Sequence, residues 1–468
     1  MALIPIYWWN KEVRNFRISQ TSFRKQPWAN GVILLACVAL AMLLANLPFT
    51  KEIYHNFLHT EFTIHIASPD GFIDWFLPRD MTMEKFINDI LMVVFFFTVG
   101  LEIKREIVCG ELSSPKKAVM PVIAALGGVV APALIFALIN NGTPAASGWG
   151  IPTATDIAFA VGILAILGDR VPVSLKVFLT ALAIADDLIA ILVVALFYGG
   201  TINFLFLGLA GVVVAFLLWL NVTGEKRPWF YFIPAVFVWI LFYYSGIHAT
   251  MSGVVMALLI PMKPRYSKTY YLRKRSFLEA KLTESDLNTD SKNFPDHIQQ
   301  IILRQLSRNA RESIGLSYRL EHTLAPWVSF VIMPVFALAN AGVRIDDPSY
   351  FNVFSYSPEL GGAGMGIFLG LLLGKPIGIT LTSFLAVKTR IGQMPDGADW
   401  KKLLAVACLG GIGFTMSIFV DTLSFGGQAE EITMVLRDMG KVAVLMGSLC
   451  SGILGSVLII LLSGRRKG

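Results

Sequence analysis

Charge is the scarcest property of this 468-residue sequence, since only 15% of its residues are Asp, Glu, Lys or Arg and 55% are hydrophobic. Soluble globular domains carry about 25% charged residues, so this composition excludes a single water-soluble domain. The mean hydropathy of +0.64 also excludes a disordered chain, which needs low hydrophobicity. The net charge of +7 therefore has to be explained by where the charges lie.

Cysteine and alternating strand patterns are scarce as well. The four cysteines, Cys37, Cys109, Cys408 and Cys450, have neither the spacing of a metal site nor that of a disulfide framework. The chain lacks the segments of alternating hydrophobicity that transmembrane strands require. Helices remain as the structure that satisfies every backbone hydrogen bond in lipid.

Long uncharged runs are abundant, and they have the length of membrane-spanning helices. Residues 118–155 and 188–224 contain no charged side chain, whereas one helix needs only about 20 apolar residues to cross the hydrocarbon core. Breaks at Gly, Pro and Asn divide these runs into twelve predicted spans, at about 29–48, 85–104, 118–140, 152–168, 173–198, 203–221, 229–245, 247–262, 321–342, 362–387, 403–421 and 440–463. The first span is too long for a signal peptide, so we expect it to be retained.

Basic residues are distributed very unequally between the two sides of the predicted membrane. If residues 1–28 and the C-terminus lie in the cytoplasm, the cytoplasmic segments hold 32 of the 39 Lys and Arg residues and the outer segments hold six. This distribution follows the positive-inside rule. The remaining one, Lys375, lies inside a span. Orientation therefore explains the net positive charge, and we expect no nucleic-acid partner.

Two long polar segments separate predicted spans. Residues 49–84, on the predicted outer side, alternate in hydrophobicity around Pro69-Asp70-Gly71, which predicts a β-hairpin. Residues 263–320 form a predicted cytoplasmic insertion, which we expect to be helical from Pro295 to Arg319 and flexible before Pro295. The remaining spans then lie in two blocks, with spans 2–8 in 85–262 and spans 9–12 in 321–463.

Five ionisable residues are the strong cases of charge inside predicted spans, where each costs roughly 2.5–3.5 kcal/mol on insertion scales and by default indicates function. They are Asp89, Asp156, Asp186, Asp187 and Lys375. Structural roles remain open for three of them: a helix cap for Asp89, a counter-charge to helix N-termini for Asp156, and a counter-ion for Lys375. The adjacent pair differs, because two close carboxylates titrate separately and bind either a small hard cation or protons. Such competition is the physical basis of exchange.

Two spans are predicted to be interrupted. The fourth has Pro152 and hydroxyl side chains beside Asp156, and the eleventh contains Gly410-Gly411-Ile412-Gly413 followed by Thr415 and Ser417. Glycines and hydroxyls at mid-span favour unwound backbone. Interrupted helices in corresponding positions of two halves mark the binding site of many transporters, and spans 3–5 and 10–12 would then be the related repeats.

Taken together, the motifs resemble those of the NhaA-type sodium/proton antiporters. The matching segments run in order from about residue 30 to 460 and comprise Phe86-Ile87-Asn88-Asp89, Val99-Gly100-Leu101-Glu102-Ile103-Lys104-Arg105-Glu106, Thr155-Asp156-Ile157-Ala158-Phe159-Ala160, Ala181-Leu182-Ala183-Ile184-Ala185-Asp186-Asp187, Gly246-Ile247-His248-Ala249-Thr250, Arg319-Leu320-Glu321-His322, Gly374-Lys375-Pro376 and Gly411-Ile412-Gly413-Phe414-Thr415-Met416-Ser417. The resemblance implies an all-α membrane protein with inverted-topology repeats, interrupted helices 4 and 11, and a homodimer that pairs through residues 49–84. Ala325 stands where the family pattern has a second histidine, and the cytoplasmic insertion is longer than expected.

The resemblance also implies roles for individual residues. Asp187 would be the main carrier of protons and of Na⁺ or Li⁺, with Asp186 and Thr155 beside it. Lys375 would pair with Asp186 or balance the C-terminal ends of helix 11, and Asp156 would balance the N-terminal ends of helix 4. The implied pH-sensing region consists of Glu102, Glu106, Glu321, His322, Lys104 and Arg105, and the supporting residues are Asp89 and His248.

We therefore expect an electrogenic, pH-regulated Na⁺(Li⁺)/H⁺ antiporter of the inner membrane that works by alternating access. Its partners would be the transported ions, membrane lipid and a second copy of the chain, and we expect no cofactor. The alternative is a sodium-coupled solute symporter or a cation channel. We do not expect an enzyme, because Ala190 stands where prenyl-transfer chemistry would need a further Asp, and an intramembrane protease motif, Gly-x-Gly-Asp, is absent.

Overall fold

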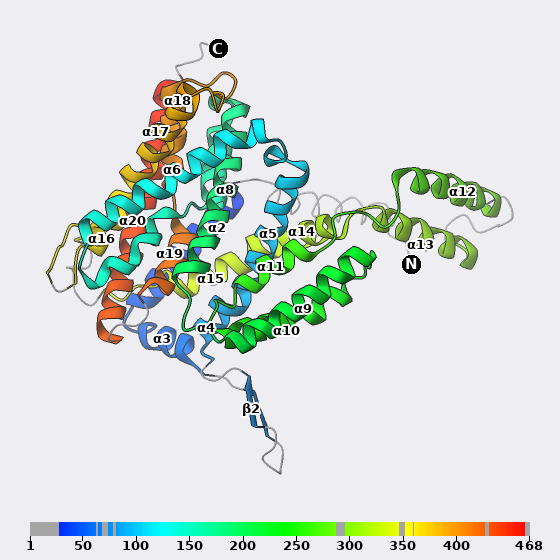
Figure 1. The fold of residues 1–468 in the computed structure, drawn as a ribbon, viewed down its shortest axis with the longest axis horizontal. Helices are drawn as coiled ribbons and strands as arrows, with labels where there is room; N and C mark the ends of the chain where they lie inside the picture. Colours follow the sequence, from blue (N-terminus) through cyan, green and yellow to red (C-terminus); the bar gives the residue numbers. More distant parts are fainter. Residues whose placement is uncertain are drawn as a thin grey trace, which may run out of the picture. The chain divides into compact units, whose positions relative to one another are not determined.

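The computed structural model of the chain describes residues 28–61, 64–67, 74–77, 81–286, 295–345, 352–358, 360–425 and 430–463. Within this part of the chain, nearly all regular structure is helical, and one antiparallel pair of strands is present (Figure 1). The chain forms two compact units, each built from separate segments. Unit 1 comprises Met1–Met92, Glu106–Gly199 and Ser329–Gly468, and unit 2 comprises Val93–Arg105 and Gly200–Val328.

Unit 1 contains most of the apolar helices. Its elements are α2 (Ala29–Asn46), α3 (Lys51–His59), β1 (Ile64–Ala67), β2 (Asp74–Leu77), α4 (Met83–Phe86), η1 (Ile87–Leu91), α6 (Pro115–Asn140), η3 (Pro144–Thr153), α7 (Ile157–Leu167), α8 (Val173–Phe197), α15 (Met333–Asn340), α16 (Ala363–Leu369), η7 (Gly370–Gly374), α17 (Lys375–Lys388), α18 (Trp400–Leu409), α19 (Phe414–Ser424) and α20 (Glu430–Leu462). Both η1 and η7 are π-helical turns: Asp89 lies in η1, and Lys375 directly follows η7. Such turns occur frequently at functional sites.

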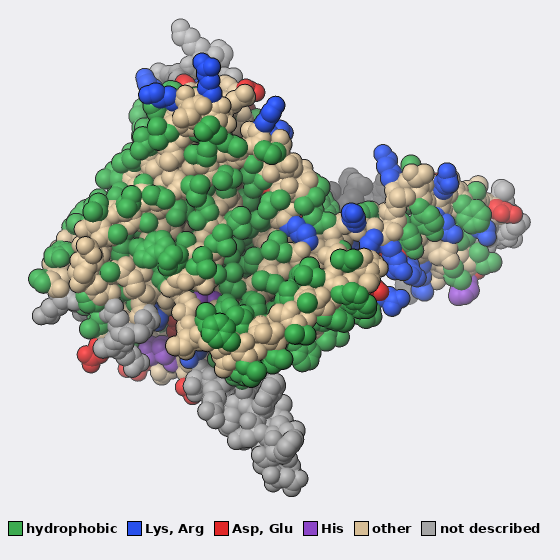
Figure 2. Space-filling view, viewed as in Figure 1, with side chains coloured by type: hydrophobic (Ala, Val, Ile, Leu, Met, Phe, Trp, Pro, Cys, Tyr) green, Lys and Arg blue, Asp and Glu red, His purple; other side chains and the backbone are tan. Residues whose placement is uncertain are grey.

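Unit 2 is built around a core of buried apolar side chains that includes Leu101, Tyr231 and Ala257. Its elements are α9 (Phe204–Thr223), α10 (Trp229–Ser245), α11 (Met251–Leu259), α12 (Lys268–Asp286), α13 (His297–Glu312) and α14 (Leu316–Trp327), and α5 (Met92–Cys109) contributes residues to both units. Helices α9 and α10 pack side by side (Figure 1). Hydrophobic side chains are spread over the face of the molecule in Figure 2, and Val222 is 86% exposed, as is expected where lipid tails rather than water cover the surface.

Local sequence explains where several helices begin and end. The side chain of Asn203 accepts a hydrogen bond from the Leu205 N–H at the start of α9, and Asp296 forms a capping box at the start of α13. Helices α9 and α10 end at Gly224 and Gly246, where φ is +85° and +82°. Glycine is favoured in this left-handed conformation because glycine lacks a Cβ atom.

Each predicted span overlaps a helix, but the helices differ in length. Among the described residues, eight helices are long and apolar enough to cross a membrane, and the number rises to ten if each of two bent helix pairs is one span. The other two predicted spans correspond to α10, with 17 residues, and α11, with nine. Nine helical residues reach only about 14 Å, so α11 is much shorter than the roughly 30 Å of a hydrocarbon core.

Three sequence-based boundaries are wrong. The fourth span does not begin at residue 152, because Pro144 starts the 3₁₀ helix η3, and proline is favoured in the first turn of a helix. Helix α20 begins at Glu430 rather than near residue 440, since a charged first part can extend a helix beyond the apolar stretch. In the insertion, residues 268–286 form α12 instead of a flexible segment, and Arg275 and Glu279 form an ion pair of 2.7 Å one turn apart in this helix.

The outer polar segment contains α3 and the two strands. Strand β1 pairs with β2 in antiparallel register, with Ile64 opposite Leu77 and Ala67 opposite Asp74. The predicted turn at Pro69-Asp70-Gly71 lies outside the described residues.

Helices α6 and α17 approach each other unusually closely because glycines face each other. A Cβ atom added at Gly378 would clash with the carbonyl oxygen of Gly127 and would lie 2.8 Å from the Cβ atom of Ala131. Directly before α17, at the end of η7, a Cβ atom at Gly374 would lie 2.8 Å from the Cα atom of Pro132 in α6. This contact fixes the position of α17, and therefore of Lys375 at its first residue.

Replacement of Gly378 by valine should therefore destabilise unit 1. We expect the Gly378→Val variant to lose about 1–3 kcal/mol or more, because an overpacked contact between rigid backbones cannot relax cheaply. Thermal unfolding of the detergent-solubilised protein measures the effect. Gly211→Val in α9 is the matched control, since no heavy atom lies within 4 Å of the added Cβ atom. Equal melting temperatures for the two variants would contradict this account.

Candidate functional site

The candidate site lies where two interrupted helices of unit 1 cross. The first interruption, residues 154–156, separates η3 from α7, and the two parts are bent by 40°. The second, residues 410–413, separates α18 from α19 with a bend of 53°. Both interruptions were predicted from glycine, proline and hydroxyl residues, although the first half of the earlier helix was missed.

The two interruptions satisfy each other's backbone groups. The Asp156 N–H donates to the Ile412 carbonyl oxygen over 2.6 Å, and the Thr155 hydroxyl donates to the Gly410 carbonyl oxygen over 2.8 Å. Unpaired backbone groups are very costly in a dry interior. Each unwound segment therefore stabilises the other, and at the end of the second one Ser448 Oγ also accepts hydrogen bonds from the Gly413 and Phe414 N–H groups over 3.2 Å.

Asp156 joins the N-termini of two half-helices. One carboxylate oxygen accepts a hydrogen bond from the Phe159 N–H over 3.2 Å at the start of α7. The other accepts from the Thr415 N–H over 3.1 Å at the start of α19, and the Thr415 hydroxyl also donates to it. Because helix N-termini carry partial positive charge, a carboxylate between two of them is favourably placed. Asp156 is only 2% exposed.

Asp186, Asp187 and Lys375 are buried next to this crossing. Lys375 Nζ donates to Asp186 Oδ2 over 2.5 Å and to Thr155 Oγ1 over 2.9 Å. The side chains of Lys375 and Asp186 are fully buried, and Asp187 is 3% exposed. Lys375 therefore binds two of the predicted site residues at once, one from α8 and one from the first interruption.

The second carboxylate oxygen of Asp186, Oδ1, is buried and accepts no hydrogen bond from the described residues. A buried charged oxygen is costly without a proton, a cation or a donor. Carboxylate and hydroxyl oxygens are ligands for small hard cations. No group of three or more His, Cys, Asp or Glu side chains suited to a transition metal exists in the described ranges.

Asp89 lies apart from these contacts, on the π-helical turn η1. The neighbouring Asn88 exchanges side-chain hydrogen bonds of 3.1 and 2.8 Å with Asn340 of α15. Asp89 itself is half-buried. Predicted as a supporting residue, it belongs to the same unit as the carboxylate pair.

The residues of the predicted pH-sensing region are not all in one unit. In unit 2, Arg105 lies 3.0 Å from Glu321 and 3.8 Å from Glu102. Lys104 Nζ donates to the carbonyl oxygen of Leu258 over 2.7 Å, which satisfies the C-terminal end of α11. Glu106 belongs to unit 1, where its carboxylate accepts a hydrogen bond from the Glu111 N–H over 3.0 Å.

The two predicted histidines also lie in unit 2. The ring of His322 packs on that of Tyr318, with 3.9 Å between the ring centroids. His248 is half-buried and precedes α11, whose first backbone N–H, that of Met251, bonds to the His248 carbonyl oxygen. His322 thus lies next to Glu321 in sequence, while its ring contacts an aromatic side chain.

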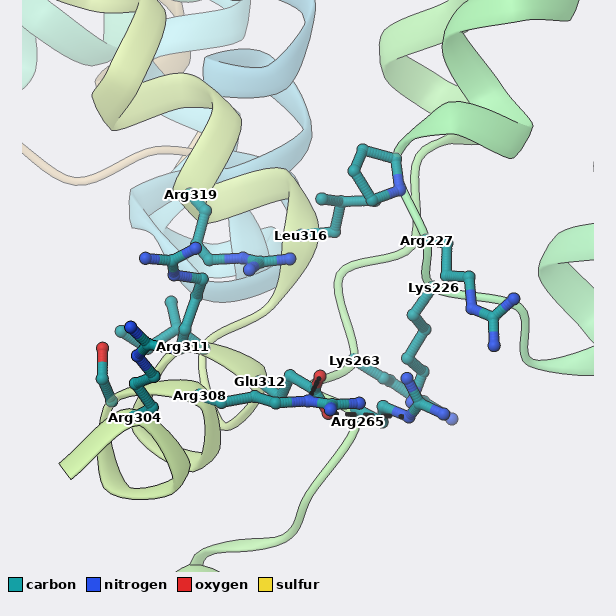
Figure 3. Close-up of a pocket in the computed structure, with 13 residues that line it drawn as sticks. Lys226, Arg227, Lys263, Arg265, Arg304, Arg308, Arg311, Glu312, Leu316 and Arg319 are labelled. Carbon is teal, nitrogen blue, oxygen red and sulfur yellow. Dashed lines mark hydrogen bonds and ion pairs between the residues drawn. The ribbon is translucent and has the colours of Figure 1, made fainter. Parts of the chain in front are cut away.

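A basic pocket in unit 2 was missed by sequence reasoning (Figure 3). It is a cavity of about 540 Å³. Cationic side chains line it from the α9–α10 loop, the segment before α12, and helices α13 and α14: Lys226, Arg227, Lys263, Arg265, Arg304, Arg308, Arg311 and Arg319. These residues are spread along the sequence, so their separate positions indicated only membrane orientation.

Glu312 is the acidic side chain that lines this basic pocket. Arg308 Nε lies 3.0 Å from its carboxylate and Arg265 Nε lies 3.7 Å from it. Burial alone would raise the pKa of Glu312, but hydrogen bonds from Arg308 and Tyr266 and the two nearby positive charges lower the pKa below its ordinary value. Glu312 is therefore ionised at neutral pH and offsets part of the positive charge.

The buried carboxylate pair, its lysine counter-charge and the crossed interrupted helices form a site of the type found in secondary transporters. The apolar helices indicate a multi-pass membrane protein. The Na⁺/H⁺ antiporter 1 family matches residues 21–459, and the chain belongs to this family.

Curated relatives cover nearly the whole chain. A protein of Helicobacter pylori (strain G27) named Na⁺/H⁺ antiporter NhaA is 42% identical over 96% of this chain and 96% of its own length. A protein of Oleidesulfovibrio alaskensis with the same name is 42% identical, covering 93% and 92%. Na⁺/H⁺ antiporter NhaA 1 of Klebsiella pneumoniae is 39% identical, covering 92% and 93%.

The buried ion pair generates a test of the role of Lys375. Lys375→Ala should destabilise the protein by about 3–5 kcal/mol, because it leaves the buried Asp186 carboxylate without its counter-charge. Combining it with Asp186→Asn should restore much of the loss, since the double variant buries no unpaired charge. Thermal unfolding of the two single variants and the double variant gives the coupling energy. Strictly additive losses would show that the two side chains do not depend on each other.

Proposed function

We propose that the chain is a Na⁺/H⁺ antiporter that also accepts Li⁺, and that Asp186, Asp187 and Thr155 hold the transported ion. The observation that carries this proposal is the burial of two adjacent carboxylates beside Lys375 and the crossed interruptions. Membership in a family named for Na⁺/H⁺ exchange supports it. The named relatives support it as well.

Competition for the same oxygens would couple the two ions. At low proton concentration the carboxylates are ionised and a cation binds; at high proton concentration protons occupy the oxygens and the cation leaves. Asp187 would be the main carrier. Lys375 would hold Asp186 in place and balance its charge while the occupancy of the site changes. Because two carboxylates can release more than one proton for each monovalent cation, the exchange would move net charge.

Alternating access would expose this site to one side of the membrane at a time. The crossed interruptions contact each other through only a few hydrogen bonds, two of which come from Thr155 and Asp156. Rigid movement of one repeat against the other about such a site is a general transport mechanism. We infer that α6 to α8 and α16 to α20 belong to these two related repeats.

The orientation follows from the positive-inside rule. With both termini in the cytoplasm, the insertion and its basic pocket face the cytoplasm. The proposed location is the inner membrane of a bacterium, where sodium would be exported and protons would enter. The outer segment with β1 and β2 would then pair two copies of the chain, and lipid would surround the exposed apolar helices.

Regulation by pH is proposed for the acidic and basic residues at the cytoplasmic end of α5 and α14. Glu321 is 6% exposed, and its ion pair with Arg105 is 3.0 Å long. Protonation of Glu321 or Glu102 would break contacts of Arg105. Glu106 and His322 belong to the same proposed sensor, and His248 would support the start of α11.

A sodium-coupled symporter and a cation channel remain the competing functions. A symporter needs an organic solute for sodium movement, and a channel carries current without proton movement. Addition of Na⁺ alone to everted vesicles that hold a pH gradient separates the three, because the antiporter alone dissipates the gradient without a solute.

Asp187→Asn should abolish exchange in that assay. An amide keeps the size of the side chain but neither carries a proton nor supplies a negative charge for the cation. The pH gradient of everted vesicles, followed with a fluorescent amine after addition of Na⁺ or Li⁺, measures the loss. Asp396→Asn is the control, because Asp396 is exposed in the loop before α18. Full activity of the Asp187 variant would disprove the assignment of the carrier.

Glu321→Gln should shift the pH of half-maximal activation upward by roughly one unit. Glutamine, like the protonated form of Glu321, cannot form the 3.0 Å ion pair with Arg105, so the variant resembles the low-pH state. The same vesicle assay at a series of bath pH values measures the shift. Glu111→Gln serves as the control, since Glu111 pairs with Lys117 at an exposed position over 3.5 Å. Identical profiles for Glu321→Gln and the unmodified chain would exclude Glu321 from the sensor.

A further inference from the structure

Asp421 in α19 is a second fully buried carboxylate that the sequence analysis placed only at the boundary of a span. Its exposed fraction is 0%. Neither carboxylate oxygen has a hydrogen-bond partner in the described part of the chain. The carboxylate packs directly against Gly440 of α20, where an added Cβ atom would lie 2.9 Å from Asp421 Cγ. A side chain at position 440 would displace Asp421, so the glycine makes room for it.

Cationic groups surround Asp421 without forming an ion pair with it. Arg437 and Lys441 of α20 attract the Asp421 carboxylate electrostatically, and Asp438 repels it. Tyr198, directly after α8, also interacts electrostatically with Asp421. Arg437 Nη2 instead donates to the Thr422 carbonyl oxygen over 2.7 Å. Arg437 Nε is buried and finds no acceptor among the described residues. A donor and an acceptor are thus both buried close together and both unsatisfied.

This arrangement differs from that of the structural carboxylate Asp156. Asp156 receives hydrogen bonds from Phe159 and Thr415, which stabilise its ionised form. Asp421 receives none from the described residues. A buried carboxyl group without donors is stable when it carries a proton, and nearby cations make its ionised form accessible as well. Such a group can alternate between the two states.

Buried hydroxyls lie along α19 on both sides of Asp421, between it and the candidate site and beyond it. Thr415 donates to Asp156, and the Ser417 hydroxyl donates to the Ile151 carbonyl oxygen over 2.8 Å. Thr415, Ser417 and Ser424 are all at most 3% exposed. Six residues of helix separate Thr415 from Asp421, a rise of about 9 Å. In the orientation proposed above, this direction leads from the site toward the outside.

We propose that Asp421 is a proton-binding site on the outer half of α19, which takes up protons from outside and passes them toward Asp186 and Asp187. The proposal rests on the function and orientation proposed above. The ligand is a proton, which binds a carboxylate oxygen of Asp421, and no bond other than O–H forms or breaks. Each proton taken up at Asp421 is released to the carboxylate pair, and Asp421 returns to its ionised form.

Asp421→Asn tests the proposal with little change in side-chain size. Everted vesicles, whose lumen corresponds to the outside, are loaded with buffers of a series of pH values, and uptake of radioactive Na⁺ from a bath of fixed pH is measured. We expect the lumenal pH of half-maximal uptake to fall by about one unit, because protons must then reach the pair without the relay. The apparent KM for bath Na⁺ should stay unchanged, since the cation site is intact.

Arg437→Gln provides the opposite test if the Asp421 variant fails to fold. Loss of the neighbouring positive charge makes Asp421 bind its proton more tightly, so the lumenal pH of half-maximal uptake should rise. Asp396→Asn again serves as the control, and we expect it to keep the lumenal pH profile of the unmodified chain. Infrared difference spectra between acid and alkaline pH should also lose one carboxylic acid signal in Asp421→Asn and none in the control.

The outcomes separate this proposal from the proposed function. If the unmodified chain takes up no Na⁺ in exchange for protons, the proposed function fails. If it does so, and Asp421→Asn and Arg437→Gln both keep its lumenal pH profile, the relay is overturned and Asp421 is only structural. A higher KM for bath Na⁺ with an unchanged pH profile would overturn it as well.

Discussion

The buried ion pair between Lys375 and Asp186 is the interaction on which the rest of the site depends. Both side chains are fully buried and 2.5 Å separates Nζ from Oδ2. Desolvation of two charges costs several kcal/mol per ion, and their attraction offsets this only in good geometry with further hydrogen bonds. Thr155 supplies one such bond, over 2.9 Å. The position of α17 is therefore coupled to α8 and to the unwound backbone of the first interruption.

The same requirement explains why the helices are interrupted in pairs. An unwound segment alone would bury backbone groups without partners, which lipid does not tolerate. Here the second interruption supplies carbonyl oxygens to Thr155 and Asp156. Asp156 in turn neutralises the positive ends of α7 and α19. Unwinding therefore leaves polar backbone and small side chains at the centre of an otherwise apolar unit.

Much of this arrangement could be predicted from the residues, because charge inside an apolar run is rare and has few structural causes. The carboxylate pair, Lys375 and both interruptions were identified in this way, and the structure brings Thr155, Asp186 and Lys375 into contact. Asp421 escaped notice, since it stands at the end of an uncharged run and resembles a boundary residue. Its burial is visible only when α20 is seen to extend back to Glu430 and to place Gly440 against it.

Other features depend on tertiary contacts that no local pattern encodes. The first half of the fourth span was missed because η3 is short, glycine-rich and 3₁₀-helical, so it lacks the period of an α-helix. The basic pocket was missed because its side chains come from three separate segments. The sequence also did not predict that Arg105 and Glu106 belong to different units, because both lie in one continuous helix, α5.

The π-helical turn η7 limits which sequence changes this protein can tolerate during evolution. A π-helical turn accommodates about one more residue than the α-helical turn it replaces, and one residue turns a helix by about 100°. Since Lys375 directly follows η7, deletion of one residue in 370–374 would leave an ordinary α-helical turn and keep the direction of the lysine, whereas insertion of one residue would turn it by about 100° away from Asp186. The two glycines of this stretch of glycine and leucine also resist substitution, because an added Cβ atom would lie 2.7 Å from the Cβ atom of Pro152 at Gly370 and 2.8 Å from the Cα atom of Pro132 at Gly374.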